Sequence, residues 1–253
     1  MTDRDRLKTT FGEDAARYRR ARPTYPPQLF EQLSGPRILE IAPGTGQATL
    51  PLTAIGDVTA VELSPDLAAL AREHAPEAQV EVANFDEWPL PAEPFDLVVC
   101  ATAFHWLDPA TRMTKCAAAL RPGGALAVIS THHVAGGTEQ FFVDVQECYE
   151  RWDPATPPNL RLSKADDIPR EFDESADFTE PEFFRYEWEQ VYDTEAYVDL
   201  LLTYSNHIAL PQRDQLIADI RHLIGTRYGG RVTKRYLTQL AVARVRSVSS
   251  GAP

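Results

Sequence analysis

The feature that most constrains this chain is an apolar run that ends in a glycine-rich turn. Residues 38–41 are apolar except for Glu40, which predicts a buried strand. The turn that follows contains Gly44 and Gly46, and residues 47–54 are suited to open a helix. A strand that turns through glycines into a helix presents backbone N–H groups and the positive end of the helix dipole. This pattern predicts a site for a nucleotide-like ligand.

The same alternation of strands and helices continues along the chain. Further apolar strands are expected at residues 58–62, 79–83, 95–101 and 125–130, the last after a turn at residues 121–124. Helices are expected between them at residues 65–74 and 109–120. Glu62 ends the second strand, where a carboxylate can accept both hydroxyls of a ribose. Alternation of this length predicts a mostly parallel sheet covered on both faces.

The two ends of the chain carry further elements. Upstream, helices are expected at residues 13–22 and 28–33. Downstream, helices are expected at residues 139–152, 194–204 and 212–224, and strands at residues 182–192 and 236–245. Residues 153–169 contain four prolines and several charges, which predicts a loop or a mobile lid.

Composition bounds the class of protein. The 253 residues suffice for one large α/β domain with an added cap. The net charge of −12 comes from 37 acidic and 25 basic side chains, and it argues against DNA or RNA as a partner. One basic cluster, Arg17, Arg19, Arg20 and Arg22, is interpreted as the coat of an N-terminal helix.

Cysteine usage and hydropathy bear on the compartment. Cys100, Cys116 and Cys148 are odd in number and widely spaced, so neither a disulfide framework nor a zinc site is expected. The chain has no 18-residue apolar stretch, and its first residues lack the apolar core of a signal peptide. A cytoplasmic protein with no membrane partner is therefore expected.

Several ordered motifs together resemble a known family, the class I S-adenosylmethionine-dependent methyltransferases of the small-molecule, methyltransferase type 11-like kind. The motifs are Glu40-Ile-Ala-Pro-Gly44-Thr-Gly46, Val61-Glu62-Leu-Ser64, Asn84-Phe85, Phe95-Asp96-Leu-Val-Val, Phe104-His105-Trp106 and Leu120-Arg-Pro-Gly-Gly124. The resemblance also reaches the leader at residues 16–26 and becomes diffuse after residue 135.

The resemblance implies an architecture. It is a Rossmann-like, seven-stranded, mostly parallel sheet with helices on both faces, an added α-helical cap and an antiparallel last strand. The implied division is a helical leader at residues 1–34, a cofactor-binding core at 35–133, a cap with the completing strands at 134–247, and a tail at 248–253. The cap is expected to face the cofactor.

The resemblance also implies S-adenosyl-L-methionine as the cofactor and assigns residues to it. The cofactor-binding residues would be Tyr18, Arg22, Glu40, Ala42, Gly44, Gly46, Glu62, Leu63, Asn84, Phe85 and Ala101. Glu62 would hold the ribose and Leu63 would pack on the adenine, while the carbonyl of Ala101 would take the amino group of the cofactor. Ala42 stands where the family usually has glycine, and Asn84 where it more often has aspartate.

The residues of the acceptor site are less defined. His105 is the candidate general base, because imidazole can accept a proton from a hydroxyl or amine near neutral pH; the alternative is that it packs on the cofactor. Trp106 is expected in the core. Residues that could line an acceptor pocket are His132, His133, Tyr204, Asn206 and His207. No metal site is expected.

The implied function is methyl transfer to an O, N, S or C nucleophile of a small molecule. Two alternatives stay open. Residues 44–49 approach the G-x-G-x-x-G pattern of an NAD(P)-dependent oxidoreductase but end in Thr49. The other alternative is a catalytically silent methyltransferase-like binding protein, since Ala42 and Asn84 depart from the family pattern.

Overall fold

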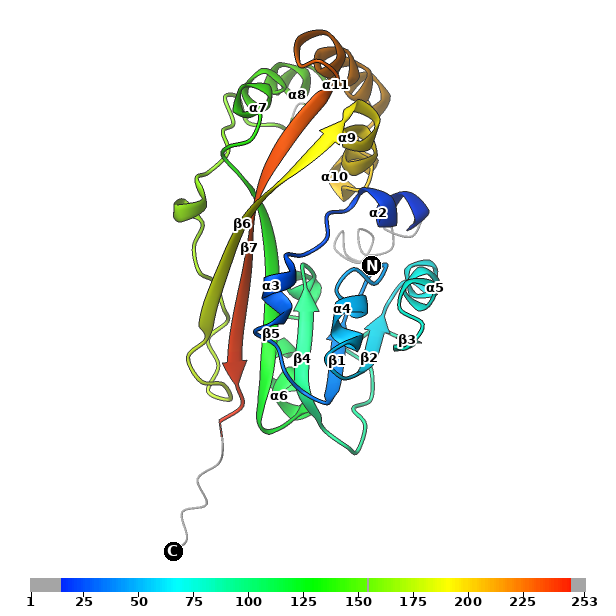
Figure 1. Cartoon of the computed structure of the whole chain (residues 1–253), viewed down its shortest axis with the longest axis vertical. Helices are drawn as coiled ribbons and strands as arrows, with labels where there is room; N and C mark the ends of the chain where they lie inside the picture. The colour runs from blue at the N-terminus through cyan, green and yellow to red at the C-terminus, as the bar shows by residue number, and fades with distance from the viewer. Residues whose placement is uncertain (1–14, 154, 247–253) are drawn as a thin grey trace, which may run out of the picture. The chain divides into compact units, whose positions relative to one another are not determined.

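The structure, a computed structural model, describes residues 15–153 and 155–246 (Figure 1). The first residues of the expected leader and the expected tail at 248–253 lie outside this part. The chain divides into two compact units, each made of separate segments. We call residues 24–130, 170–186 and 238–253 the Rossmann unit, and residues 1–23, 131–169 and 187–237 the helical unit.

Seven strands form one sheet with the order β3-β2-β1-β4-β5-β7-β6. The strands are β1 (Arg37–Ile41), β2 (Asp57–Glu62), β3 (Gln79–Val82), β4 (Phe95–Ala101), β5 (Leu120–Val134), β6 (Glu182–Asp193) and β7 (Arg231–Arg244). The pairs β1–β2, β1–β4, β2–β3 and β4–β5 are parallel. Figure 1 shows β7 directed opposite to β4. The predicted seven-stranded, mostly parallel α/β fold is confirmed.

Alternate residues of the central strands supply a core on each face of the sheet in the Rossmann unit. Ile38 on β1 and Leu97 on β4 belong to one cluster of buried side chains, and Leu39 and Val98 belong to the other. Strands that bury both faces form near-continuous apolar runs, which is why these strands could be located from the sequence.

The helices of the Rossmann unit are short. They are α3 (Pro27–Phe30), α4 (Thr49–Thr53), α5 (Pro65–His74), α6 (Arg112–Ala119) and the 3-10 turn η1 (Phe104–Trp106). Helix α5 has the predicted bounds because Ser64 caps it, accepting the N–H of Leu67 at 3.4 Å, and Pro65 occupies its first position.

The helical unit has its own apolar core, which includes Phe141, Leu200, Ile220 and Tyr236. Its helices are α2 (Ala15–Ala21), α7 (Glu139–Asp144), α8 (Gln146–Trp152), α9 (Thr194–Leu201), α10 (Ser205–Ile208) and α11 (Arg213–Arg227), with the 3-10 turn η2 (Ala165–Asp167). The side chain of Asp193 caps α9 by accepting the N–H of Ala196 at 2.8 Å, as expected.

Three local predictions are corrected. The single helix expected at 139–152 is two helices that meet at Val145, and beside this break the side chain of Gln146 donates to the carbonyl of Phe142 at 3.1 Å. The turn expected at 121–124 lies inside β5, next to a register shift. Helix α4 begins only at Thr49, since the glycine turn occupies the residues before it.

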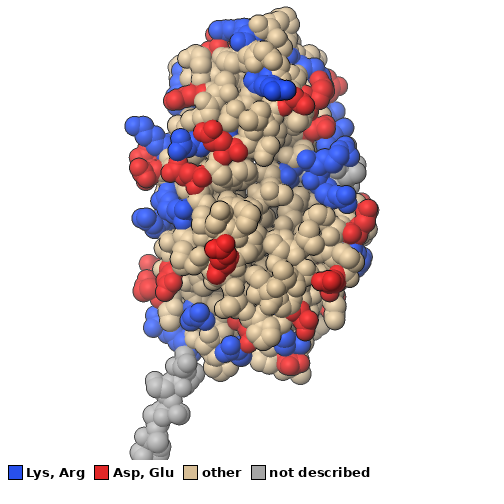
Figure 2. Space-filling model, viewed as in Figure 1, with Lys and Arg blue, Asp and Glu red and all other residues tan. Residues whose placement is uncertain are grey.

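The charged side chains show little segregation by sign. Acidic and basic side chains are interspersed over the face drawn in Figure 2, and basic side chains gather at the place of α2. Two arginines of the predicted cluster bind within the helical unit: Arg17 pairs with Asp199 at 3.1 Å, and Arg22 donates to the carbonyl of Thr203 at 3.0 Å. Across the residues that the structure describes, no helix is both long and apolar enough to cross a membrane.

Candidate functional site

The carboxyl ends of the parallel strands meet at one edge of the sheet. Ile41, at the end of β1, pairs with Val61 on β2 and with Cys100 on β4. Ligands of open α/β sheets bind at this edge. Within the Rossmann unit, the residues predicted to bind the cofactor end or follow these strands: Glu40, Ala42, Gly44, Gly46, Glu62, Leu63, Asn84, Phe85 and Ala101.

The two glycines of the turn after β1 have different surroundings. Both have positive φ, +61° at Gly44 and +89° at Gly46. A Cβ at Gly44 would meet no atom within 4 Å, whereas a Cβ at Gly46 would lie 3.3 Å from the Cα of Ala71 on α5. Gly44 therefore leaves open space beside the turn, and Gly46 allows the turn to pack on a helix.

Two residues other than glycine also have positive φ at this edge. Ala42 follows β1 with φ +54°, and Thr102 follows β4 with φ +56°. This conformation costs an L-residue about 1–2 kcal/mol, which gives a physical reason for glycine at the Ala42 position in the family. Such strained residues gather at ligand sites.

The difference between the glycines gives a prediction. Gly44→Ala should weaken binding of S-adenosylhomocysteine about tenfold with a loss of stability of about 1 kcal/mol, because the added methyl group enters the open space at positive φ. Gly46→Ala should lower the free energy of unfolding more, since its methyl group presses on α5. Calorimetric titration and urea unfolding of both variants check this, and equal effects on stability and affinity in the two variants would contradict it.

Glu62 is buried, and its carboxylate holds the glycine turn. One carboxylate oxygen accepts the N–H of Gly44 at 3.0 Å, and the other accepts the N–H of Ser64 at 2.9 Å. Besides the ribose contact predicted for it, this carboxylate therefore has a structural role that the sequence did not predict. Burial raises the pKa of Glu62, and the two backbone N–H groups oppose that rise. Each oxygen keeps a lone pair, so the carboxylate can still accept hydroxyl groups.

Glu40 lies on β1 and is 1% exposed. Within the described part of the chain, neither of its carboxylate oxygens has a hydrogen-bond partner, and neither does the buried hydroxyl of Thr49. Burial raises the pKa of Glu40 to about 8, and the charge of Glu62 adds to this rise. The nearby hydroxyl of Thr49 opposes the rise, although it does not reach hydrogen-bond geometry. Glu40 is therefore largely protonated at neutral pH.

The residues expected near the adenine flank the ends of β2 and β3. Leu63 is 39% exposed. The side-chain oxygen of Asn84 accepts the N–H of Asp86 at 3.2 Å. The side chain of Phe85 is buried, and the ammonium of Lys115 lies 5.1 Å from its ring and donates to the carbonyl of Asp86. These contacts fix the loop after β3.

The carbonyl of Ala101, at the end of β4, already has one partner. The hydroxyl of Thr102 donates to it at 2.8 Å and also lies 3.3 Å from the hydroxyl of Tyr25. Tyr25 belongs to the leader that resembles the family, and the structure places it at the end of β4. One lone pair of the Ala101 carbonyl stays available for an amino group.

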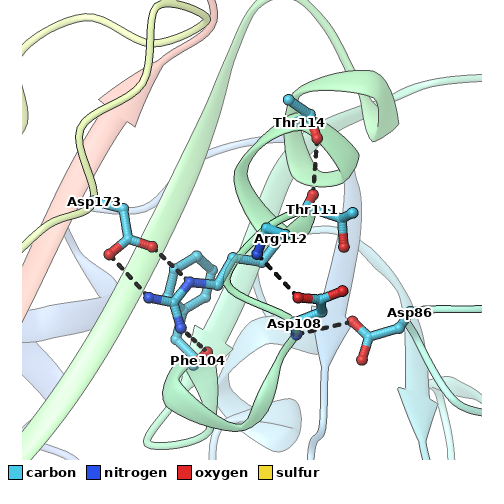
Figure 3. Close-up of polar contacts among 8 residues, drawn as sticks. Asp86, Phe104, Asp108, Thr111, Arg112, Thr114 and Asp173 are labelled. Atoms are coloured by element: carbon cyan, nitrogen blue, oxygen red, sulfur yellow. Dashed lines mark hydrogen bonds and ion pairs between the residues drawn. The ribbon is translucent and has the colours of Figure 1, made fainter.

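His105 lies on η1 in the loop after β4 and is exposed. Its ring is 4.9 Å from that of Trp106, which is half-buried rather than in the core as expected. The loop is held by Arg112 (Figure 3), whose guanidinium donates to the carbonyl of Phe104 at 3.0 Å and to both oxygens of Asp173 at 2.5 and 2.9 Å. Arg112 thus ties the His105 loop to the segment that precedes β6.

Loss of the ion pair between Arg112 and Asp173 should lower the stability of the protein measurably. Asp173→Asn removes the charge that holds the guanidinium of Arg112, so the free energy of unfolding should fall by about 1 kcal/mol, a small value because Asp173 is 35% exposed. Glu174→Gln, an exposed neighbour, is the matched control and should unfold like the wild type in urea. Identical unfolding of the two variants would show that the ion pair does not stabilise the loop.

Tyr18 and Arg22 belong to the helical unit. The side chain of Tyr18 lies outside the described residues. The guanidinium of Arg22 lies 4.5 Å from the ring of Tyr204 and donates to the carbonyl of Thr203, so it anchors α2 to the segment after α9. The contact of either residue with the cofactor stays a prediction. The expected acceptor residues His132, His133, Tyr204, Asn206 and His207 are also in the helical unit.

Sequence reasoning missed three residues of this site: Thr102, Arg112 and Lys115. Thr102 had a signal, since it directly follows the strand that ends at Ala101. Arg112 and Lys115 lie one helical turn from each other on α6, and only the fold shows that they reach the loops after β4 and β3. In the described part of the chain, no three His, Cys, Asp or Glu side chains are grouped to hold a metal ion.

Residues 39–128, which contain the end of β1, all of β2 to β4 and most of this site, match the family model described as a methyltransferase domain. The matched segment is therefore assigned to the class I S-adenosylmethionine-dependent methyltransferase family. An uncharacterized methyltransferase of Mycobacterium tuberculosis is 35% identical over 127 residues, 49% of this chain and 52% of that protein. A ubiquinone biosynthesis O-methyltransferase of Xylella fastidiosa is 37% identical over 103 residues, 38% of this chain and 42% of that enzyme.

Solved structures extend the likeness in fold to most of the chain. A candidate type II methyltransferase of Anaeromyxobacter dehalogenans superposes with a TM-score of 0.61 at 22% identity, covering 89% of this chain and 98% of that one. This likeness shows the fold. The chain spans about half the length of the first curated relatives it matches, so they define a shared domain rather than a shared acceptor.

Proposed function

We propose that this protein transfers the methyl group of S-adenosylmethionine to an O, N, S or C atom of a small-molecule acceptor. The observation that carries the proposal is the pairing of Glu62 with the turn after β1. A carboxylate is held by the N–H groups of Gly44 and Ser64 beside a glycine that leaves open space. The family membership of residues 39–128 supports the same cofactor and argues against an NAD(P)-dependent oxidoreductase.

The residues present fit a cofactor with a ribose, an adenine and an amino-acid end. Glu62 offers lone pairs for ribose hydroxyls, and exposed Leu63 offers an apolar surface for adenine. Near the turn, buried polar atoms without a partner in the described residues are both carboxylate oxygens of Glu40, Nε2 of Gln47 and the hydroxyl of Thr49. Buried polar groups are normally satisfied, so their grouping is expected where a ligand or ordered water binds.

The chain's own residues then bind, orient and exclude water. The cofactor supplies a methyl group that its sulfonium already activates. Glu62 and the N–H groups of the turn would fix the nucleoside, and the carbonyl of Ala101 would accept an N–H of the amino group. Holding donor and acceptor in one geometry supplies most of the catalysis such a transfer needs. Where the acceptor must lose a proton, His105 would take it at an imidazole nitrogen.

The proposal is tested by direct turnover. The protein is incubated with S-adenosylmethionine carrying a ¹³C-labelled methyl group and a library of small alcohols, phenols, amines, thiols and carboxylates. We expect one-to-one formation of S-adenosylhomocysteine and a labelled product by mass spectrometry. Tight binding of NAD without binding of S-adenosylmethionine would overturn the proposal. Cofactor binding with no product from any acceptor would favour the silent binding protein.

We also propose that the protein acts in a reducing cytoplasm. In support, all three cysteines are free thiols, and Cys100 and Cys116 are buried. A reducing compartment is where unpaired cysteines are usual. The acidic net charge of −12 supports an acceptor other than nucleic acid.

A further inference from the structure

A buried lysine in the helical unit lacks a counter-ion. Lys234 lies on β7, 4% exposed, on the same face of the strand as Val232 and Tyr236. Among the described residues, no carboxylate forms an ion pair with the ammonium of Lys234. Asp153, whose charge acts on His207, forms none with it either. Lysine is almost never fully buried without a partner, because an isolated charge in the interior is costly.

The surroundings of Lys234 satisfy its ammonium only weakly. Its Nζ lies 5.3, 5.6 and 6.0 Å from the ring centroids of Tyr236, Tyr204 and Tyr197, near the outer limit for cation–π attraction. One of its three N–H donors reaches the hydroxyl of Tyr204 at 3.4 Å, which is long for a hydrogen bond. The ammonium therefore has donor capacity that the protein does not use.

A second group in the same cluster is also unsatisfied. The ring of His133 lies 6.0 Å from that of Tyr236, and its Nε2 is buried without a hydrogen-bond partner among the described residues. Burial, with the charge of Lys234 adding to it, lowers the pKa of His133 to about 2, so this imidazole is neutral. In its Nε2–H form, the ring can donate one hydrogen bond.

Another histidine in the cluster, His207, differs from His133 because both of its ring nitrogens have hydrogen-bond partners. Nε2 of His207 lies 2.9 Å from the hydroxyl of Tyr149, and its Nδ1 lies 3.1 Å from the side-chain oxygen of Asn206. Burial lowers the pKa of His207 to about 4. The cluster thus contains the positive charges of Lys234 and of Arg22, which lies over the ring of Tyr204, together with neutral imidazoles and phenols, and it has unused donors at Lys234 and His133. Tyr204, Trp188 and His133 are half-buried, so its edge reaches the surface.

We infer that Lys234 and His133 bind the carboxylate of a small organic anion among these aromatic rings. A carboxylate would supply the counter-ion that Lys234 lacks and accept the free N–H of His133. The aromatic rings of Tyr204, Tyr236 and Trp188 suit an organic rather than an inorganic anion.

The test uses two carboxylates and their neutral amides. Sodium benzoate and sodium succinate are titrated into the full chain by calorimetry without cofactor, beside benzamide and succinamide. We expect at least one carboxylate to bind and its amide to bind about tenfold or more weakly, the loss of one charge-assisted hydrogen bond. Lys234→Met should lose the binding by a similar factor, while Lys164→Met, an exposed lysine of the same unit, should keep it.

Thermal unfolding separates binding from a structural role. Lys234→Met should unfold at the same temperature as the wild type or higher, because it removes an unpaired buried charge. A lower unfolding temperature with unchanged carboxylate binding, or equal binding of each carboxylate and its amide to the wild type, would overturn the inference. S-adenosylhomocysteine is titrated into the same samples: if it fails to bind while the carboxylate binds, the proposed function fails and the carboxylate site stands.

Discussion

Glu62→Ala should weaken binding of S-adenosylhomocysteine at least about 100-fold, the largest loss of affinity that we expect from one substitution. The carboxylate would accept two ribose hydroxyls, and hydrogen bonds to a charged acceptor contribute about 1.5–3 kcal/mol each. The variant also leaves the N–H groups of Gly44 and Ser64 without their acceptor, so the free energy of unfolding should fall by about 1–3 kcal/mol. Calorimetric titration and urea unfolding measure the two effects separately.

Asp57→Ala is the matched control for this experiment. Asp57 is an exposed carboxylate at the opposite end of the same strand, β2. The Asp57→Ala variant should bind S-adenosylhomocysteine like the wild type, because the amino end of a parallel strand lies away from the edge of the sheet where ligands bind. A Glu62→Ala variant that folds and binds S-adenosylhomocysteine normally would contradict the assigned ribose contact.

Glu40→Gln should change how stability depends on pH. The pKa of Glu40 is raised from 4.5 to about 8, so the folded protein holds this proton more tightly than the unfolded chain. The stability linked to it is present in full below pH 4.5 and is lost as the pH rises through 8. Glutamine cannot ionise, so Glu40→Gln should exceed the wild type by up to about 4 kcal/mol at pH 8 and match it near pH 4.5.

Urea unfolding at a series of pH values between 4.5 and 8.5 measures this difference. Glu77→Gln, an exposed glutamate, serves as the control and should follow the wild type across the whole range. A constant difference between Glu40→Gln and the wild type across the range would mean that Glu40 ionises at its ordinary pH and is not in an isolated, buried position.

The sequence predicted those parts of the fold that depend on local signals. The apolar runs located β1, β2 and β4 to within a residue, and the pair Ser64-Pro65 located the start of α5. The break between α7 and α8 at Val145 could not be predicted, because the apolar periodicity of residues 139–152 continues through it.

The candidate site shows the same limit. The residue types and their order identified Glu62 and the glycine turn, but the bond between Glu62 and the N–H of Gly44 joins residues 18 positions apart and exists only in the folded sheet. The difference in surroundings between Gly44 and Gly46 likewise depends on the packing of α5 against the turn. Lys234 lay outside the strand predicted at 236–245; β7 begins at Arg231, and only its observed alternation places Lys234 on one face with Val232 and Tyr236.

The most direct test of the central claim is a crystal structure of the protein with S-adenosylhomocysteine. The account predicts the ribose hydroxyls against the carboxylate of Glu62, the adenine on Leu63, and the amino-acid end along the glycine turn toward the carbonyl of Ala101. Crystals that contain the ligand elsewhere, or that leave this edge of the sheet filled by side chains at saturating ligand, would contradict it.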